Sequence, residues 1–227
     1  PQSRKSLSHR LLWLALLLSV GIGALSVRTL WTLRNDEWNY ALQANANLVG
    51  TLARSLEWTL DAVDQSLFSV VSDLEHMKQL PPAAQLRQQL RFEGLMRLQG
   101  QGDVLVLNAQ GDIILDSGAT EPRKANLADR DYFRAFKDGR HDGLFIGKPV
   151  PSRVSQLNFL PMARAYHTAD GAFAGIVLSA VRLSYFNELF ASVNLGDNSG
   201  VNLFLADGII VSRFPYGDLD VGKSLAG

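Results

Sequence analysis

The sequence predicts an α+β fold with an apolar helix at its start, and three observations lead to this prediction. Residues 11–27 form an uncharged, almost wholly apolar run, and residues 35–79 contain no proline and repeat apolar positions in steps of three and four. From residue 104 onward, short apolar runs alternate with glycine-containing turns. The first two patterns are typical of helices and the third of antiparallel strands. An antiparallel sheet with helices on its face is an α+β arrangement.

Composition excludes several classes of function. Lys and Arg total 22 residues and Asp and Glu also total 22, so nucleic-acid binding, which needs a surplus of basic residues, is not expected. The chain contains no cysteine, which excludes disulfides, thiol catalysis and cysteine-based metal sites. The four histidines lack close ligand spacing, and no phosphate loop or nucleophile elbow is present. We therefore expect no metal, no cofactor and no catalysis within this chain.

The apolar run predicts a transmembrane helix over residues 11–33. Its uncharged part is about 26 Å long at ~1.5 Å per residue, and the residues up to 33 lengthen it toward the ~30 Å of a hydrocarbon layer. The preceding residues, 1–10, include Arg4, Lys5 and Arg10, which predicts a cytoplasmic N-terminus. The alternative is a cleaved signal peptide, but no small-x-small cleavage site follows the run.

A long helix is predicted over residues 34–80, where Pro81-Pro82 ends it. Its apolar positions follow a heptad-like pattern: Trp38, Leu42, Val49, Leu52, Leu56, Leu60, Val63, Leu67, Val70, Leu74 and Met77. One interpretation is a dimerisation helix, which packs on the sheet at its far end and on its twin near the membrane. The alternative is a helix that packs only on its own domain.

The residues that follow predict a sheet lobe over 81–192. The expected elements are a helix at 83–98, a hairpin of 104–107 and 112–115, a helix at 129–137, strands at 143–150, 158–168 and 173–183, and a helix at 185–192. The segment VNLFLADGIIVSR from Val201 resembles VLVLNAQGDIILDS from Val104. Residues 193–227 are therefore predicted to begin a second lobe of the same kind.

The predicted 129–137 helix carries the first candidate binding residues. Arg130 and Phe133 are three positions apart and can share a helix face, and Tyr132 lies beside them. A guanidinium beside aromatic walls suits a carboxylate, because it donates two parallel hydrogen bonds. The alternative is that the aromatic residues belong to the core and that Arg130 pairs with Asp129 or Asp131.

Two segments carry a resemblance to a known family: LADRDYFRAFKDGRHDGLFIGKPVPSRVS from Leu127, and ARAYHTADGAFAGIVLSAVRLSYFNELFASVNLGDNSGVNLFLADGIIVSRFP from Ala163. They resemble the double-Cache (PDC) sensors of bacterial receptors, above all the version joined to GGDEF diguanylate cyclases. The resemblance covers roughly residues 35–227. It implies a PAS-like, membrane-distal lobe with a ligand pocket and a membrane-proximal lobe. It also implies a sensor in the periplasm, anchored in the bacterial inner membrane.

The resemblance implies how a ligand is held. In the amino-acid-binding branch of the family an Arg-x-Trp-Tyr motif holds the ligand carboxylate. Arg130 matches the arginine of that motif, and Tyr132 and Phe133 occupy its aromatic positions. Ala125 and Ala180 stand where the family has the Tyr and Asp that hold the amino group. The resemblance therefore favours a small molecule with a carboxylate or other anionic group over an α-amino acid.

Four further residues lie on the strands and loop that follow this helix, where the family has its pocket wall and rim. They are Phe145, Arg153, Phe159 and Arg164. The alternative for each of them is ordinary packing or a surface position.

The predicted function is ligand sensing outside the cytoplasm by a transmembrane receptor that regulates a diguanylate cyclase, and hence cyclic di-GMP. The alternatives are the input domain of a sensor histidine kinase or chemoreceptor, and a membrane-tethered binding module or enzyme without a signalling role. The sequence after residue 227 would distinguish the first two. This chain itself is not expected to be an enzyme.

Overall fold

The computed structural model describes residues 2–77, 86, 102–119, 121–153, 155, 157–193, 199–215 and 220–225. Contacts divide the chain into two units, Pro1–Arg54 and Ser55–Gly227. Helix α1 (Gln2–His76) contributes to both units. The end of the long helix at Pro81-Pro82 and nearly all of the helix expected at 83–98 lie outside the described residues.

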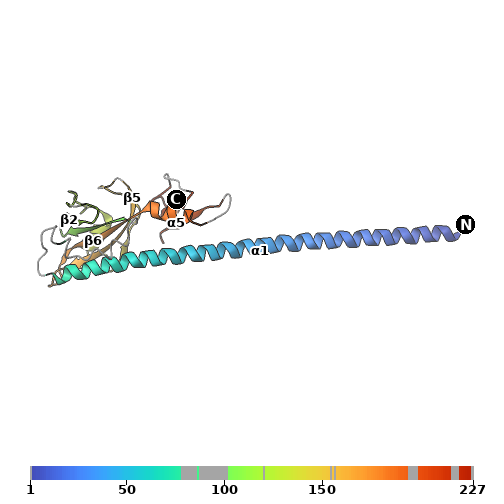
Figure 1. Ribbon diagram of the computed structural model, residues 1–227, viewed down its shortest axis with the longest axis horizontal. Coiled ribbons are helices and arrows are strands. Elements are labelled where there is room, and N and C mark those ends of the chain that lie inside the picture. Colours follow the sequence, from blue (N-terminus) through green and yellow to red (C-terminus); the bar gives the residue numbers. More distant parts are fainter. Residues whose placement is uncertain are drawn as a thin grey trace. The chain divides into compact units, whose positions relative to one another are not determined.

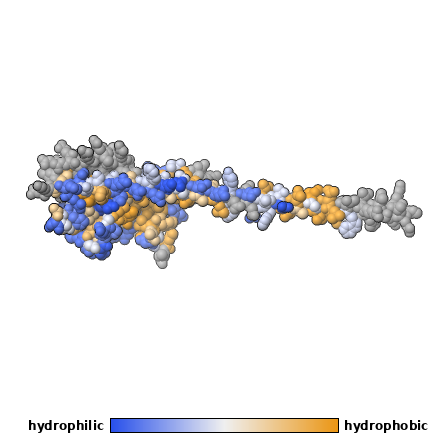
Figure 2. All heavy atoms as spheres, turned by 90° about the horizontal axis from the view of Figure 1, so that it is seen from below, coloured by the Kyte–Doolittle hydropathy of each residue, from blue (hydrophilic) through white to orange (hydrophobic). Residues whose placement is uncertain are grey.

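The first unit consists of the N-terminal part of α1. Among the described residues, Leu16–Arg34 is the one helical segment long and apolar enough to cross a membrane. Its large apolar side chains are exposed, with Leu25 and Trp31 each 71% accessible. Figure 2 shows an orange, hydrophobic stretch in this part of the helix. This segment overlaps the predicted 11–33 span, and none of it is buried by the residues that the structure describes.

The second unit is built on an antiparallel sheet, as the sequence predicts. Its strands are β1 (Gly102–Asn108), β2 (Ile113–Asp116), β3 (Phe145–Ile146), β4 (Val150–Pro151), β5 (Asn158–His167) and β6 (Phe173–Arg182). The order is β2-β1-β6-β5-β3, and β4 also pairs with β5. The two ten-residue strands β5 and β6 therefore form the centre of the sheet.

The single strand expected at 143–150 is wrong, because the structure has two short strands there. Ile146 in β3 pairs with Met162, whereas Val150 in β4 pairs with Phe159. Between these two pairs the edge segment advances by four residues, whereas β5 advances by only three. The extra residue means that the chain leaves the hydrogen-bonded ladder between β3 and β4. Pro149 lies in this gap, where a residue without a backbone N–H costs no ladder hydrogen bond.

Helix α1 covers one face of the sheet with its C-terminal part, as Figure 1 shows. The apolar positions Val63, Leu67, Val70 and Leu74 are all at most 4% exposed. This end of the heptad-like pattern therefore packs within the chain. The earlier positions of the same pattern differ, since Trp38, Leu42 and Val49 are between 53% and 69% exposed.

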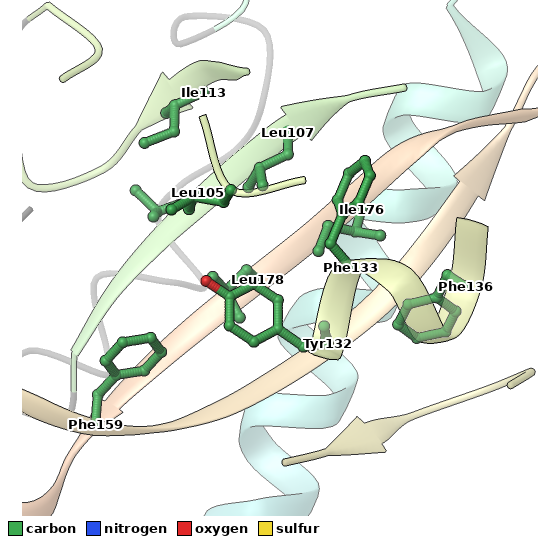
Figure 3. Close-up of a cluster of buried hydrophobic side chains, with 11 residues drawn as sticks. Leu105, Leu107, Ile113, Tyr132, Phe133, Phe136, Phe159, Ile176 and Leu178 are labelled. Carbon is green, nitrogen blue, oxygen red and sulfur yellow. The ribbon is translucent and has the colours of Figure 1, made fainter. Parts of the chain in front are cut away.

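Helix α4 (Asp131–Lys137) covers the opposite face. It is shorter than the predicted 129–137 helix because Arg130 is extended, with φ −72° and ψ 144°. The side chains of Tyr132, Phe133 and Phe136 point from α4 onto the strands in Figure 3. They meet alternate residues of the strands in one apolar cluster: Leu105, Leu107, Phe159, Ala163, Ile176 and Leu178. Alternation along each strand places these residues on the α4 face and their neighbours on the α1 face.

The chain then continues through α5 (Leu183–Ala191) into a two-stranded sheet of β7 (Val201–Phe204) and β8 (Ile210–Phe214). Two hydrogen bonds connect α5 to its surroundings. Ser212 Oγ of β8 lies 2.8 Å from Asn187 Oδ1, and Tyr185 Oη lies 2.7 Å from Thr59 Oγ1 of α1. Helix α5 therefore contacts both the second hairpin and the long helix.

The two hairpins have the same turn, as the sequence repeat suggested. Asn108 N–H donates to Asp112 O at 3.0 Å, and Leu205 N–H donates to Ile209 O at 2.9 Å. Each turn contains a glycine with positive φ, +86° at Gly111 and +81° at Gly208. That conformation favours glycine because a Cβ atom would crowd the backbone.

The likeness extends beyond the turns. Leu127 N–H donates to Gly111 O at 2.8 Å, and Leu225 N–H donates to Gly208 O at 3.1 Å. In both halves the chain therefore returns to its own turn glycine after the hairpin. The described part of residues 193–227 thus has the same hairpin turn and returning segment as residues 102–127, and its assignment as the start of a second lobe stays a prediction.

Candidate functional site

A cavity of about 590 Å³ lies where three segments meet. The first segment is residues 129–132 at the start of α4. The second is the β3–β4 edge, with Phe145, Lys148 and Val150, and the third is the β7–β8 turn, with Leu205, Asp207 and Ile209. A cavity of this size can hold a small metabolite.

Arg130 lines this cavity and has no carboxylate partner among the residues that the structure describes. Its Nη2 donates to the backbone oxygen of Pro151 at 3.0 Å, and its Nε is buried without a hydrogen-bond partner in the described structure. The neighbouring acids are already engaged. Asp129 accepts two hydrogen bonds from Arg153, at 2.7 and 2.6 Å, and Asp131 lies 3.6 Å from Lys148. Arg130 therefore forms an ion pair with neither Asp129 nor Asp131 in the structure.

The exposed pair of Asp129 and Arg153 affects both partners. Hydrogen bonds from Arg153 lower the pKa of Asp129, and the same bonds raise the pKa of Arg153. Both groups thus remain charged near neutral pH. Arg153, a predicted rim residue, thereby neutralises the acid next to Arg130. Arg130 remains the cation in this cavity that is available to an anion.

Tyr132 lines the cavity and is only 3% exposed. Burial raises the pKa of its hydroxyl to about 12, so the hydroxyl stays protonated at neutral pH and can donate a hydrogen bond. Among the residues that the structure describes, this hydroxyl has no partner. Its ring meets Phe159 edge-on, with ring centroids 6.4 Å apart. Because Tyr132 lines the cavity, its hydroxyl can donate a hydrogen bond to a ligand or water bound there.

The structure separates the other predicted aromatic residues. Phe145 lines the cavity and meets Phe136 edge-on, at 6.1 Å between ring centroids. Phe133 is fully buried and packs against Phe173, at 5.7 Å. Phe133 therefore belongs to the core beneath the cavity rather than to its surface.

Phe159 and Ala180 line a second cavity, of only about 30 Å³. This volume holds roughly one water molecule. Asp103 on β1 is the residue paired with Ala180 across the sheet. Its carboxylate lies 2.8 Å from Arg123 and 3.8 Å from Arg182. The one nearby acid is thus already neutralised, and the space beside Ala180 is too small for a metabolite.

Arg164 does not belong to either cavity, and its predicted place at the pocket is corrected by the structure. Along β5, Phe159 and Ala163 face α4, so alternation turns Arg164 toward α1. There its Nε and Nη2 donate to the two carboxylate oxygens of Asp64, at 2.5 and 2.9 Å. These hydrogen bonds raise the pKa of Arg164. Arg164 thus fixes the sheet to the long helix.

Sequence reasoning missed Lys148 and the three residues of the β7–β8 turn. Asp207 lies in the turn of the second hairpin, where Leu205 N–H donates to Ile209 O. Its approach to α4 depends on how the second hairpin packs, and no motif in the sequence reports that packing. Within the described parts of the chain, no three His, Asp or Glu side chains come together as a metal site requires.

Comparison with known proteins identifies a family. The sequence profile of a family described as the Cache domain matches residues 35–224. No curated protein matches the chain.

Solved structures agree with this match. The extracellular domain of rpHK1S-Z16, a protein assigned to the histidine kinases, is similar at 26% identity and a TM-score of 0.68, over 79% of this chain and 72% of that one. The isoleucine-bound sensory domain of the Campylobacter jejuni chemoreceptor Tlp3 shares the fold at 12% identity, TM-score 0.61, over 78% and 71%. So does the ligand-binding domain of the Pseudomonas aeruginosa chemoreceptor PctC, in complex with GABA, at 19% identity, TM-score 0.57, over 75% and 75%.

Proposed function

The chain belongs to the Cache family, as a ligand-sensing domain of a signalling receptor, and from this membership we propose that its ligand is a small molecule whose anionic group is held by Arg130. The observation that carries the proposal is a guanidinium without a carboxylate partner, with a buried and unpaired Nε, in a cavity of about 590 Å³. A carboxylate accepts two parallel hydrogen bonds from such a group. Tyr132 and Phe145 supply aromatic walls.

Replacing Arg130 with alanine tests the proposal. A panel of monocarboxylates, dicarboxylates and inorganic phosphate is first screened by thermal shift, and each binder is then measured by calorimetry. We expect Arg130→Ala to weaken binding about ten- to a hundred-fold, because a charge-assisted hydrogen-bonded contact contributes roughly 1.5–3 kcal/mol. Arg130→Lys should restore little, since an ammonium lacks the planar fork.

Arg134 provides the matched control. It lies one turn further along α4, is exposed and does not line the cavity. Arg134→Ala should leave the affinity unchanged. Equal affinities of the parent protein and Arg130→Ala would exclude Arg130 as the anchor.

We further propose that the chain is anchored in the bacterial inner membrane by Leu16–Arg34, with the sensor in the periplasm. The exposed apolar surface of this segment supports the proposal, as do the basic residues before it. We also propose a homodimer through the exposed part of the heptad-like pattern, which includes Trp38, Leu42 and Val49. Leu52 is only 5% exposed within the single chain, so the dimer surface excludes it.

A single introduced cysteine tests both the dimer and the orientation, because the chain has no cysteine of its own. In membranes, Val49→Cys should form disulfide-linked dimers severalfold more than Thr51→Cys, since two positions along a helix turn the side chain by about 200°. A membrane-impermeant maleimide should label both variants from the periplasmic side. Equal cross-linking of the two variants would argue against this dimer surface, and labelling only after lysis would argue against the orientation.

The output is proposed to be a diguanylate cyclase, on the strength of the sequence resemblance given above. A histidine kinase is the second candidate, because the 26%-identical neighbour is assigned to that class. The sequence that follows residue 227 distinguishes them. A GGDEF motif supports the first, and a histidine-containing dimerisation helix with an ATP-binding domain supports the second.

A further inference from the structure

The cavity around Arg130 is shared by the two lobes. Arg130 and Tyr132 come from the start of α4 in the first lobe, whereas Leu205, Asp207 and Ile209 come from the β7–β8 turn of the second. A molecule bound in the cavity therefore touches both lobes at once. The second lobe supplies one charged residue to this contact, Asp207.

Among the charged residues that line the cavity, Arg130 and Asp207 have no ionic partner within the described structure. Asp129 is paired with Arg153 and Asp131 with Lys148. Arg130 forms no ion pair within the described structure. Asp207 likewise forms none there, and its Oδ1 accepts only the N–H of Ile209, at 3.2 Å. One positive charge from the first lobe and one negative charge from the second thus face the same space.

We propose that this cavity binds an elongated molecule with an anionic group at one end and an ammonium or similar cationic group at the other. The anionic end lies on Arg130 and the cationic end on Asp207, so that the ligand links the two lobes. The inference rests on the proposed function and specifies its ligand class. A ligand with anionic groups at both ends is disfavoured, because a second negative charge would meet Asp207.

The linkage gives the ligand a route to the long helix. The β7–β8 hairpin is joined to α5 through Ser212 and Asn187, and α5 is joined to α1 through Tyr185 and Thr59. A ligand that contacts the hairpin turn stabilises the placement of the hairpin in which both ends are satisfied. Only this difference in affinity between two placements can shift the equilibrium between them.

Three six-carbon probes test the ligand class on the full chain in detergent: hexanoate, 6-aminohexanoate and adipate. Calorimetry should show that 6-aminohexanoate binds at least tenfold more tightly than hexanoate and that adipate binds most weakly. Asp207→Lys should invert this order in favour of adipate. Asp170→Lys is the matched control, because Asp170-Gly171 is also an Asp-Gly turn with positive φ at glycine (+82°) and does not line the cavity. The Asp170→Lys variant should rank the three probes in the same order as the parent protein does.

Hydrogen exchange tests the contact with the second lobe directly. Bound 6-aminohexanoate should slow amide exchange in residues 201–214 and leave the equivalent turn at 108–112 unchanged. Absence of 6-aminohexanoate binding, or an order of probes that Asp207→Lys leaves unaltered, would overturn the inference. If binding of the probes still depends on Arg130 in that case, the proposed function stands. If Arg130→Ala binds every probe as the parent does, the proposed function fails as well.

Discussion

Replacing Arg123 with methionine should lower the free energy of unfolding by about 3–5 kcal/mol. Asp116 has a completely buried side chain and accepts hydrogen bonds from Nε and Nη2 of Arg123. Without the guanidinium, its carboxylate retains the N–H of Gly118, at 2.9 Å, as a donor. A buried charge without its counter-ion is strongly destabilising. Urea unfolding monitored by circular dichroism measures the change.

The exposed pair of Arg153 and Asp129 is the matched control for this experiment. It is also a bidentate pair, but its side chains are 43% and 61% exposed. Arg153→Met should therefore leave the urea midpoint nearly unchanged, because solvent screens an exposed ion pair. Adding Asp116→Asn to Arg123→Met should recover more than half of the lost stability, because the buried charge is removed. Equal losses for Arg123→Met and Arg153→Met would refute the role assigned to burial.

Gly175→Ala should destabilise the protein by about 3–5 kcal/mol, through a backbone collision and a strained φ. Gly175 has φ +151°, and a Cβ atom built there would lie 1.9 Å from Leu107 O and 2.8 Å from Tyr166 Oη. Tyr166 Oη itself donates to Leu107 O at 3.1 Å. The missing side chain therefore makes room for a buried hydrogen bond between β5 and β1.

The Gly171→Ala variant separates the cost of the backbone collision at Gly175 from the cost of a positive φ. Gly171 has φ +82°, but no heavy atom lies within 4 Å of a Cβ built there. Its substitution should cost only about 1–2 kcal/mol, the strain of a left-handed residue. The chemical denaturation midpoints of the two variants provide the comparison. Similar midpoints would show that β1 and β5 can move apart without loss.

Long elements with a clear period were predictable from the sequence. The strands expected at 158–168 and 173–183 are β5 and β6, with boundaries shifted by only one residue. Both are long, apolar and bounded by turn residues. The edge at 143–150 was not predictable in the same way. Its division into two strands depends on how it pairs with β5, and a local pattern does not contain the register of its partner.

Two residues of the candidate site lie on one short segment, where a local sequence pattern can place them together, and their role in binding stays a prediction. Arg130 and Tyr132 were identified from their spacing and from the family motif, and both line the cavity. Arg164 was misplaced because a strand pattern shows that alternate residues face opposite ways but not which face carries the ligand. Asp207 was missed for a different reason, since it and Arg130 line the same cavity only because tertiary packing brings together segments more than seventy residues apart.

The matching turns of the two hairpins have an evolutionary consequence. Gly111 and Gly208 accept the same returning hydrogen bond, from Leu127 and Leu225, which is the pattern that duplication of one ancestral hairpin unit would leave. Duplication releases one copy of a loop from its original constraints. In the first turn, Gln110 occupies the position that corresponds to Asp207, and its backbone oxygen accepts a hydrogen bond from Asn126 at 2.9 Å, whereas Asp207 lines a cavity. Divergence after duplication would thus have converted a structural turn into a surface on which selection for a new ligand can act.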